Sequence, residues 1–306
     1  MRKSILLTSL LAAYMLPHSA LAQEEAAVAQ AEAEAPASNW AFTSNIGFVS
    51  DYYFRGVSQN WHRPAVQGGF DLSHTSGFYA GIWGSSISPN TYPDASVEID
   101  YYAGYNGKFG NSESLKDFGW TVGGYGYTYP NGDWDKYVIA GVNQGTEGDF
   151  DTFEINTGLS WKWLSGKVSY TLTDWFGAEE DTGFKDDSKG TTYWELNANV
   201  PLPWWGLTLV GHVGHLNVST ELDLTVGSSA NIANEDDPDY TDYKIGLSKS
   251  FSLANSEGWN AGIFYVGADD TGYWGKRGFG GASFNNGSEV KDLTDNRWVV
   301  TVGRVF

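Results

Sequence analysis

The chain has 306 residues, a formal net charge of −19 and no cysteine. Such acidity argues against nucleic-acid binding, which needs basic surface to displace the counterions of phosphate, and the missing cysteine excludes disulfide scaffolds and Cys-based zinc or redox sites. Aromatic residues make up 16% of the chain, far more than disordered chains carry, and together with 38 glycines they favour β-structure over helix.

The first 22 residues have the features of a secretory signal peptide. Arg2 and Lys3 form the charged start, residues 5–16 form an apolar stretch, and Ala20-Leu21-Ala22 forms the small-residue cleavage site. A transmembrane anchor would need about 20 apolar residues, and this run is shorter. We therefore expect export, with cleavage after Ala22.

Two further segments follow in the mature chain. Residues 23–38 contain mainly alanine and acidic residues and offer no apolar face to bury, which predicts a flexible periplasmic tail. Residues 39–306 form the rest of the chain, and their pattern is that of strand, turn and strand.

From Trp40 onward, hydrophobic residues recur with a period of two. In the first run, Phe42, Ile46 and Phe48 share one face, while the other face is mostly small or polar. A soluble β-sandwich alternates too, but runs of this kind are about twice as long as the 5 or 6 residues usual in globular strands. Strands of about 10 residues are what a tilted transmembrane barrel requires.

The predicted fold is all-β: a single antiparallel transmembrane β-barrel of about twelve strands. The predicted strands cover residues 40–55, 63–74, 78–88, 95–107, 118–129, 150–163, 166–176, 191–200, 206–218, 241–251, 258–268 and 296–306. Two further β-like runs, 136–143 and 222–226, would raise the number to fourteen. We prefer twelve, because fourteen strands would place the tight Trp163–Gly166 turn on the extracellular side.

The connections alternate in length, as they do in outer-membrane barrels. With the N-terminus in the periplasm, the short turns at 74–77, 163–166, 201–206 and 253–258 face the periplasm. Most connections on the other side are longer, and the acidic loops at 178–190 and 219–241 are the clearest examples. We therefore expect short periplasmic turns and long extracellular loops.

The aromatic residues are expected to form two girdles at the membrane interfaces, where an amphipathic ring is most stable. The predicted periplasmic girdle contains Trp40, Trp120, Trp161, Trp163, Trp204, Trp205 and Trp259. The predicted external girdle contains Tyr52, Phe54, Tyr127, Tyr129, Trp175, Phe176, Trp194 and Trp298.

The final strand ends in Phe306, which resembles the C-terminal signature of outer-membrane proteins and implies recognition by the barrel-assembly machinery. Arg304 departs from the apolar residue often found at that position. Lys249 likewise precedes Phe251 by two residues, and a long basic side chain there can extend its charge into the lipid headgroups.

Two stretches in the first part of the barrel resemble the TorF family of porin-like proteobacterial outer-membrane proteins. They are Ser50–Gln59 (SDYYFRGVSQ) and Pro64–Asp71 (PAVQGGFD), and the exit from the fifth strand at Tyr127–Pro130 agrees with the same pattern. The insertion at 131–150 is longer than the family pattern. The resemblance implies an outer-membrane barrel with a transport function, and it names no substrate.

Alternation predicts which polar side chains face the lumen. These pore-lining candidates are Asn45, Asp51, Arg55, Gln67, Asp71, Glu98, Asp100, Glu154, Lys162, Glu195 and Lys244. Acids outnumber bases in this set, and we expect Asp51 and Arg55 to pair near the external mouth. A net negative lumen favours cations and neutral polar molecules over anions.

The predicted function is therefore a porin-like channel for passive diffusion of small polar or cationic solutes. An alternative is a plugged structural or adhesive barrel without transport, because a narrow barrel can close its interior with ion pairs. A barrel enzyme acting on lipid is a third possibility, but no nucleophile elbow, phosphate loop or metal-ligand spacing supports it. We expect no enzymatic activity and no cofactor.

The histidines do not indicate a metal site. His212 and His215 differ by three, so they point to opposite faces of a strand, and His62 is expected to be solvated in the first external loop. The acidic clusters at 179–181, 186–187 and 235–239 lack a recognised calcium-loop spacing. We expect them to meet lipopolysaccharide, with divalent ions bridging the charges. The other expected partners are outer-membrane lipid and a small solute.

Overall fold

The computed structural model of the protein describes residues 38–110, 112–113, 115–134, 138–139, 142–143, 148–223, 237–269 and 291–306. The predicted signal peptide, and the predicted tail up to residue 37, lie outside the described residues. The predicted divisions at Ala22 and residue 38 therefore stay predictions.

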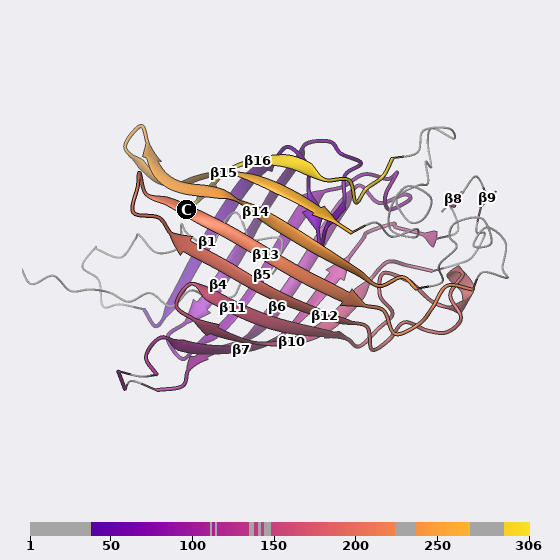
Figure 1. Cartoon of the computed structure of the whole chain (residues 1–306), viewed down its shortest axis with the longest axis horizontal. Helices are drawn as coiled ribbons and strands as arrows, with labels where there is room; N and C mark the ends of the chain where they lie inside the picture. Colours follow the sequence, from indigo (N-terminus) through magenta and orange to yellow (C-terminus); the bar gives the residue numbers. More distant parts are fainter. Residues whose placement is uncertain are drawn as a thin grey trace, which may run out of the picture.

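Twelve strands form one closed antiparallel barrel, as predicted (Figure 1). They are β1 (Trp40–Val49), β4 (Ala65–His74), β5 (Phe78–Ser86), β6 (Val97–Lys108), β7 (Phe118–Thr128), β10 (Thr152–Trp161), β11 (Leu164–Thr171), β12 (Thr192–Pro201), β13 (Leu207–Asn217), β14 (Tyr240–Leu253), β15 (Ser256–Ala268) and β16 (Arg297–Val305). Each strand pairs with its neighbours in the sequence, and β1 closes the ring by pairing with β16.

The alternative of fourteen strands is wrong. In the run 136–143, the described residues form the two short strands β8 (Val138–Ile139) and β9 (Val142–Asn143), which pair with each other outside the barrel. In the run 222–226, Leu222 forms a single bridge with Phe184, and residues 224–226 lie outside the described part.

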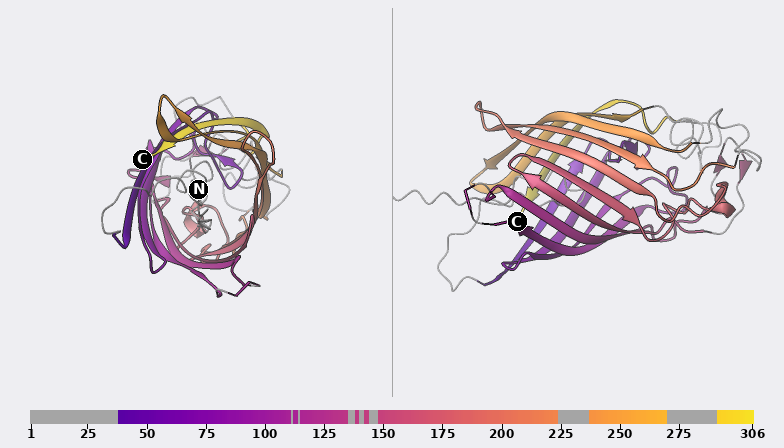
Figure 2. Two further views of the ribbon diagram at one scale, coloured as in Figure 1. Left: turned by 90° about the vertical axis from the view of Figure 1, so that its left-hand side faces the viewer. Right: turned by 60° about the horizontal axis from the view of Figure 1, so that its bottom comes forward.

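The two ends of the barrel differ (Figure 2). At one end, tight connections such as residues 162–163 and 254–255 join neighbouring strands, and the C-terminus lies at this short-turn end (Figure 1). At the opposite, long-loop end, the connections include residues 50–64 and 172–191. This difference in length is the one that the sequence predicts.

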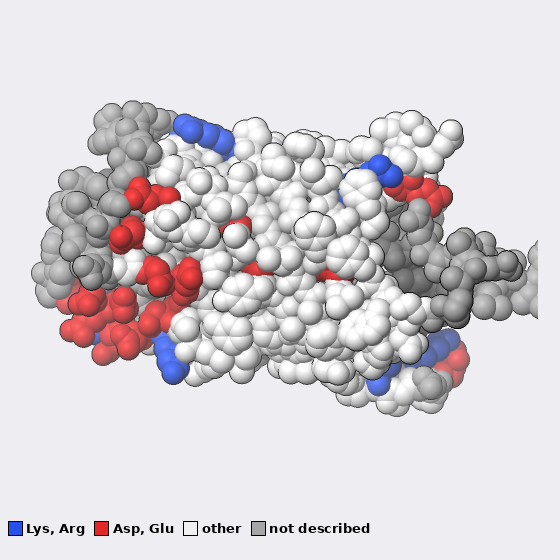
Figure 3. Space-filling model, turned by 180° about the vertical axis from the view of Figure 1, so that it is seen from behind, with Lys and Arg blue, Asp and Glu red and all other residues white. Residues whose placement is uncertain are grey.

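The outer face of the barrel is apolar. Phe42, Leu159 and Trp194 are each more than half exposed although they lie mid-sheet, as side chains that face lipid do. Charged side chains gather at the two ends, with the acidic ones concentrated at the long-loop end, and the wall between them carries few (Figure 3). The part of the chain that the structure describes holds no helix with the length and apolarity needed to cross a bilayer.

The predicted girdle at the short-turn end is confirmed, but most of the other girdle is wrong. Six of the seven tryptophans predicted for the short-turn end are exposed, Trp205 most of all at 82%. In the predicted external girdle, Trp194 and Trp298 are exposed, whereas the remaining six rings are at most 5% exposed: Tyr52, Phe54, Tyr127, Tyr129, Trp175 and Phe176. These six pack against one another inside the barrel, so they fill its mouth instead of meeting lipid.

The cause is that the first strand ends earlier than predicted. β1 stops at Val49, and residues 50–64 then fold into the long-loop end of the barrel. This segment, which we call the plug loop, contains the short hairpin β2 (Tyr53–Phe54) and β3 (Val57–Ser58). The predicted strand 166–176 overshoots in the same way, because β11 ends at Thr171.

Candidate functional site

The tip of the plug-loop hairpin carries Arg55. Phe54 pairs with Val57, so Arg55 and Gly56 are the two turn residues, with φ of 44° and 79°. Two positive φ values are those of a type I′ turn, which matches the right-handed twist of a hairpin and favours glycine. The stretch Ser50–Gln59, which carries the resemblance to the TorF family, therefore folds so that an arginine lies at the tip of a tight hairpin.

The guanidinium of Arg55 is buried against the barrel wall. Its Nη2 donates to both carboxylate oxygens of Glu154 on β10, at 2.9 and 3.0 Å. The rings of Tyr193, Trp175 and Phe54 lie 4.0, 4.7 and 4.9 Å from its central carbon. Cation–π attraction adds to the ion pair in such a desolvated setting. We call Glu154, Tyr193, Trp175 and Phe54 the arginine box.

A row of tyrosines connects this ion pair to two further acids. Tyr125, Tyr127 and Tyr129 follow one another on the inner face at the end of β7, two residues apart. Their hydroxyls donate to Asp100 at 2.9 Å, to Glu154 at 3.0 Å and to Glu98 at 3.0 Å, respectively. Each tyrosine thus satisfies one oxygen of a carboxylate on a neighbouring strand, while the second oxygens of Glu98 and Asp100 are buried without a hydrogen-bond partner among the described residues.

A second polar network covers the opposite side of Tyr193. The Tyr193 hydroxyl donates to Asp242 on β14 at 2.6 Å, and His212 on β13 lies 3.0 Å from the same carboxylate. The other ring nitrogen of His212 is 2.6 Å from the amide oxygen of Asn197. Through Tyr193 this network contacts the arginine box, so the wall strands β10, β12, β13 and β14 hold one continuous cluster.

The base of the plug loop is fixed by a second set of contacts. Asp51 accepts from Ser58 at 2.7 Å and lies 2.7 Å from Nδ1 of His62. Nε2 of His62 donates to the carbonyl of Asp292 at 2.6 Å, on the connection before β16. Both ring nitrogens face oxygen atoms, so His62 connects Asp51 of the plug loop to the segment before β16.

The structure brings four of the predicted pore-lining residues together: Arg55, Glu98, Asp100 and Glu154, all at most 3% exposed. Asn45, Gln67, Asp71, Glu195 and Lys244 also lie on inward-facing strand positions, and all but Gln67 are half-buried. Glu195 lies 3.4 Å from Lys167 on the adjacent strand.

Three predictions about individual residues are wrong. Lys162 is exposed in the turn after β10, with φ of 53°, because the strand ends at Trp161 before the alternation would turn it inward. Asp51 and Arg55 do not pair, because Arg55 extends to Glu154 while Asp51 contacts Ser58 and His62. The His62 ring is buried rather than solvated, because the plug loop that carries it folds inward. His212 and His215 do lie on opposite faces, as predicted.

Several site residues are absent from the predicted set. The period of two alone would have placed four of them on the inner face: Lys167, Tyr193, His212 and Asp242. In the structure each lies opposite an inward residue of the next strand. Trp175 gives no such signal, because it follows the end of its strand.

Gly214 on β13 makes room for Tyr193, because a Cβ at Gly214 would overlap the Tyr193 hydroxyl. Gly214→Ala should therefore displace that hydroxyl from Asp242 and lower the free energy of unfolding by about 1–3 kcal/mol, the usual cost of overpacking. Urea unfolding in detergent, followed by tryptophan fluorescence, measures this change. Gly211→Ala on the same strand is the matched control, since its nearest neighbour would be 4.0 Å away. Equal effects of the two substitutions would contradict the prediction.

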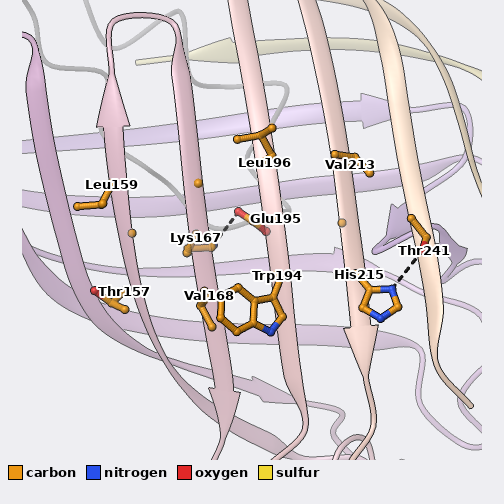
Figure 4. Close-up of a pocket in the computed structure, with 13 residues that line it drawn as sticks. Thr157, Leu159, Lys167, Val168, Trp194, Glu195, Leu196, Val213, His215 and Thr241 are labelled. Atoms are coloured by element: carbon orange, nitrogen blue, oxygen red, sulfur yellow. Dashed lines mark hydrogen bonds and ion pairs between the residues drawn. The ribbon is translucent and has the colours of Figure 1, made fainter.

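A groove of about 690 Å³ lies over β10–β14 (Figure 4). Its side chains are mainly those of the outward set, including Leu159, Trp194 and Val213. The groove is thus a hollow in the lipid-facing surface and is not part of the lumen.

Three carboxylates meet at the long-loop end. Oxygens of Asp174, Glu179 and Asp187 lie within 4.8 Å of one another. Burial, followed by the charge of Asp174, raises the pKa of Glu179. The expected bridging of the acidic loops by divalent ions stays a prediction, and residues 235 and 236 of the third acidic cluster lie outside the described part.

The interior is most tightly packed at the long-loop end. At the long-loop end, Glu98, Asp100 and Asp242 are at most 3% exposed. From mid-barrel towards the short-turn end, Asn45 and Asp71 are half-buried, whereas Thr121, Thr208 and Asn260 are at most 7% exposed. The described residues therefore form a barrel whose lumen is packed shut beneath the long loops.

Three solved structures illustrate what the chain is similar to, and the first is an outer-membrane protein. OprD from Pseudomonas aeruginosa is 10% identical over 80% of this chain and 59% of its own, with a TM-score of 0.35. OccAB1 from Acinetobacter baumannii is 14% identical over 84% and 60%, with a TM-score of 0.39. The NanC porin is 13% identical over 87% and 98%, with a TM-score of 0.42. The chain thus spans about three fifths of the length of OprD and OccAB1.

Comparison by sequence gives one family. No curated protein matches the chain. The sequence profile described as "Bacterial protein of unknown function (Gcw_chp)" matches residues 32–306, which include the whole barrel. The protein therefore belongs to the Gcw_chp family.

Proposed function

We propose that this barrel is an outer-membrane channel for small polar solutes, and that the plug loop holds its external mouth closed in the conformation described. The observation that carries the proposal is a polar, charged interior inside a closed barrel with an apolar exterior. A purely structural barrel would gain little from such an interior, because buried ion pairs often stabilise a fold no more than apolar residues of similar volume would.

The orientation follows from the connections. Short turns and the C-terminus mark the periplasmic end of outer-membrane barrels, and the long acidic loops then face the cell exterior. On this orientation the plug loop lies beneath the external loops. The expected contacts with lipopolysaccharide, and with the assembly machinery through Phe306, belong to the same proposal.

A preference for cations is the finer part of the proposal. Of the inward acids, Glu154 pairs with Arg55 and Glu195 with Lys167, whereas Asp71, Glu98 and Asp100 accept from tyrosine hydroxyls. These three lie on β4 and β6, and in the open state, where water reaches them, they would form a negative wall along the lumen. Such a wall attracts cations and repels anions.

The dense packing around Arg55 favours one other candidate, a barrel that transports nothing and presents its loops to partners. An enzyme has less support. Ser58, Asp51 and His62 are adjacent, but Ser58 and His62 both bind Asp51, and the far nitrogen of His62 faces a carbonyl. His62 therefore does not face Ser58 as a base would face a nucleophile.

Removing the plug loop distinguishes a channel from a scaffold. Val49 and Ala65 are register partners, so residues 50–64 can be replaced by Asn-Gly, the preferred two-residue turn. In planar bilayers the shortened barrel should conduct about tenfold or more above the full-length protein, as the plugged population gives way to an open one.

The control is a similar cut at the other end, in which Asn-Gly replaces residues 110–117 between β6 and β7. This variant should behave like the full-length protein. Circular dichroism and heat-dependent mobility in gels establish that each barrel is folded. Folded but silent plug-free barrels would contradict the channel and favour the scaffold.

A further inference from the structure

The arginine box belongs mostly to the barrel wall and not to the plug loop. Glu154 lies on β10, Tyr193 lies on β12, and Trp175 follows β11, whereas Arg55 and Phe54 come from the hairpin. If the hairpin left, the wall would keep a carboxylate with two aromatic rings beside it. A carboxylate next to aromatic faces is a combination that recognises organic cations.

Arg55 fills this place incompletely. A guanidinium has five N–H donors in a planar fork, yet Nη2 alone reaches Glu154. Among the described residues, the buried Nε and Nη1 of Arg55 have no hydrogen-bond partner. The φ of 44° also places the backbone of Arg55 in the left-handed region, which residues other than glycine and asparagine rarely adopt. A guanidinium that is not attached to a hairpin could orient more of its donors towards the wall.

The acidic side chains of the wall favour a cation at this place. Glu98 and Asp100 flank the box and, within the described part of the chain, form no ion pair; each accepts from a tyrosine. Without Arg55, the wall would present these acids and Glu154 with no base among them. Release of the hairpin separates Arg55 from Glu154, and a cation that takes the place of Arg55 beside Glu154 offsets the loss of this ion pair.

We propose that the arginine box is a binding site for the guanidinium group of a small cationic solute, and that Arg55 occupies it in place of the solute. This inference rests on the proposed channel function and names its substrate class. A solute that binds the box and a hairpin that occupies it exclude each other, so solute binding shifts the loop towards the open state. The channel then opens when its substrate is present.

The test compares two probes of the same shape and different charge. Methylguanidinium chloride at about ten millimolar, added to the loop side of a bilayer, should raise the open probability of the wild-type barrel several-fold, whereas neutral methylurea should not. Glu154→Gln should show a higher basal open probability and no response to methylguanidinium. Lys185→Met breaks an exposed ion pair outside the arginine box, Lys185–Glu221, and should behave like the wild type.

A second measurement does not depend on conductance. In Arg55→Ala the box is vacant, and methylguanidinium should raise the melting temperature of this variant by about 2–4 °C, as a ligand that binds the folded state does. The same probe should leave Arg55→Ala/Glu154→Gln unchanged.

The outcomes separate the two proposals. Equal effects of methylguanidinium and methylurea on both readouts would overturn the arginine box as a ligand site, even where the plug-free barrel conducts. A silent plug-free barrel would overturn the channel, and a charge-specific rise in melting temperature would then support the site alone.

Discussion

Replacing Arg55 by methionine should increase the undocked population of the plug hairpin by about two to three orders of magnitude. The reason is that Glu154, which is 2% exposed, would remain buried without its counter-charge. Breaking a buried ion pair from one side costs about 3–5 kcal/mol, and each 1.4 kcal/mol is a tenfold change in an equilibrium. Hydration of Glu154 after the hairpin leaves recovers this cost, so the hairpin undocks while the barrel stays folded.

Hydrogen exchange measures this opening at defined amides. The amide of Ser58 donates to the carbonyl of Leu293, and that of Gln59 donates to Tyr52. Both should exchange faster in Arg55→Met, while amides within β13 and β14 should keep their protection. Unchanged exchange at Ser58 would show that contacts other than the ion pair hold the loop.

The double variant Arg55→Met/Glu154→Gln identifies the ion pair as the cause. A neutral amide needs no counter-charge, so exchange should return most of the way to the wild-type rate. Exchange as fast as in the single variant would mean that lost packing of the arginine stem explains the effect.

Adding a single methyl group at Gly56 should release the plug hairpin as well. Gly56 has φ of 79°, and a Cβ there would lie 2.5 Å from the Cβ of Asp242 and 2.9 Å from the Cβ of Ala268. These atoms belong to β14 and β15, so no flexible side-chain end can move aside. Gly56→Ala should therefore undock the hairpin and raise the bilayer conductance towards that of the plug-free barrel.

Gly206→Ala separates backbone strain from the steric overlap. Gly206 has φ of 64° in a short turn, and its Cβ would meet nothing within 4 Å. This control should cost about 1 kcal/mol, the usual effect of a left-handed conformation on a residue with a side chain, and leave conductance unchanged. Equal conductance changes in both variants would show that tight packing at Gly56 does not hold the hairpin.

The strands could be predicted from the sequence, because a wall between lipid and lumen imposes a period of two over its whole length. The same signal failed at Val49. Tyr52 and Phe54 continue the alternation of β1, and a hairpin that folds inward has the same period as the strand before it. Hydrophobicity does not distinguish a ring that faces lipid from one that packs in a lumen. The same cause therefore explains why Tyr52 and Phe54, and the other buried rings of the predicted external girdle, were wrongly expected to face lipid.

The ion pair of the site lay beyond the reach of local patterns. Arg55 and Glu154 were both predicted to face the lumen, but they are 99 residues apart in the sequence. Their contact depends on how far the hairpin extends from Val49 towards β10. Asp51 shares a face with Arg55 in an extended strand, and the type I′ turn at Arg55 and Gly56 removes that relation.

The seam between β1 and β16 sets a condition on how this barrel comes to exist. The two strands share five register pairs, from Asn45–Val305 to Val49–Thr301, whereas β1 and β4 share ten. Partners in the seam are more than 250 residues apart, and every other neighbouring pair of strands is joined by a far shorter connection. The sheet can therefore grow one hairpin at a time. The backbone N–H and C=O groups of its two edge strands stay unpaired until β16 reaches β1. Ring closure is thus the step for which the entire barrel sequence must already be at the membrane.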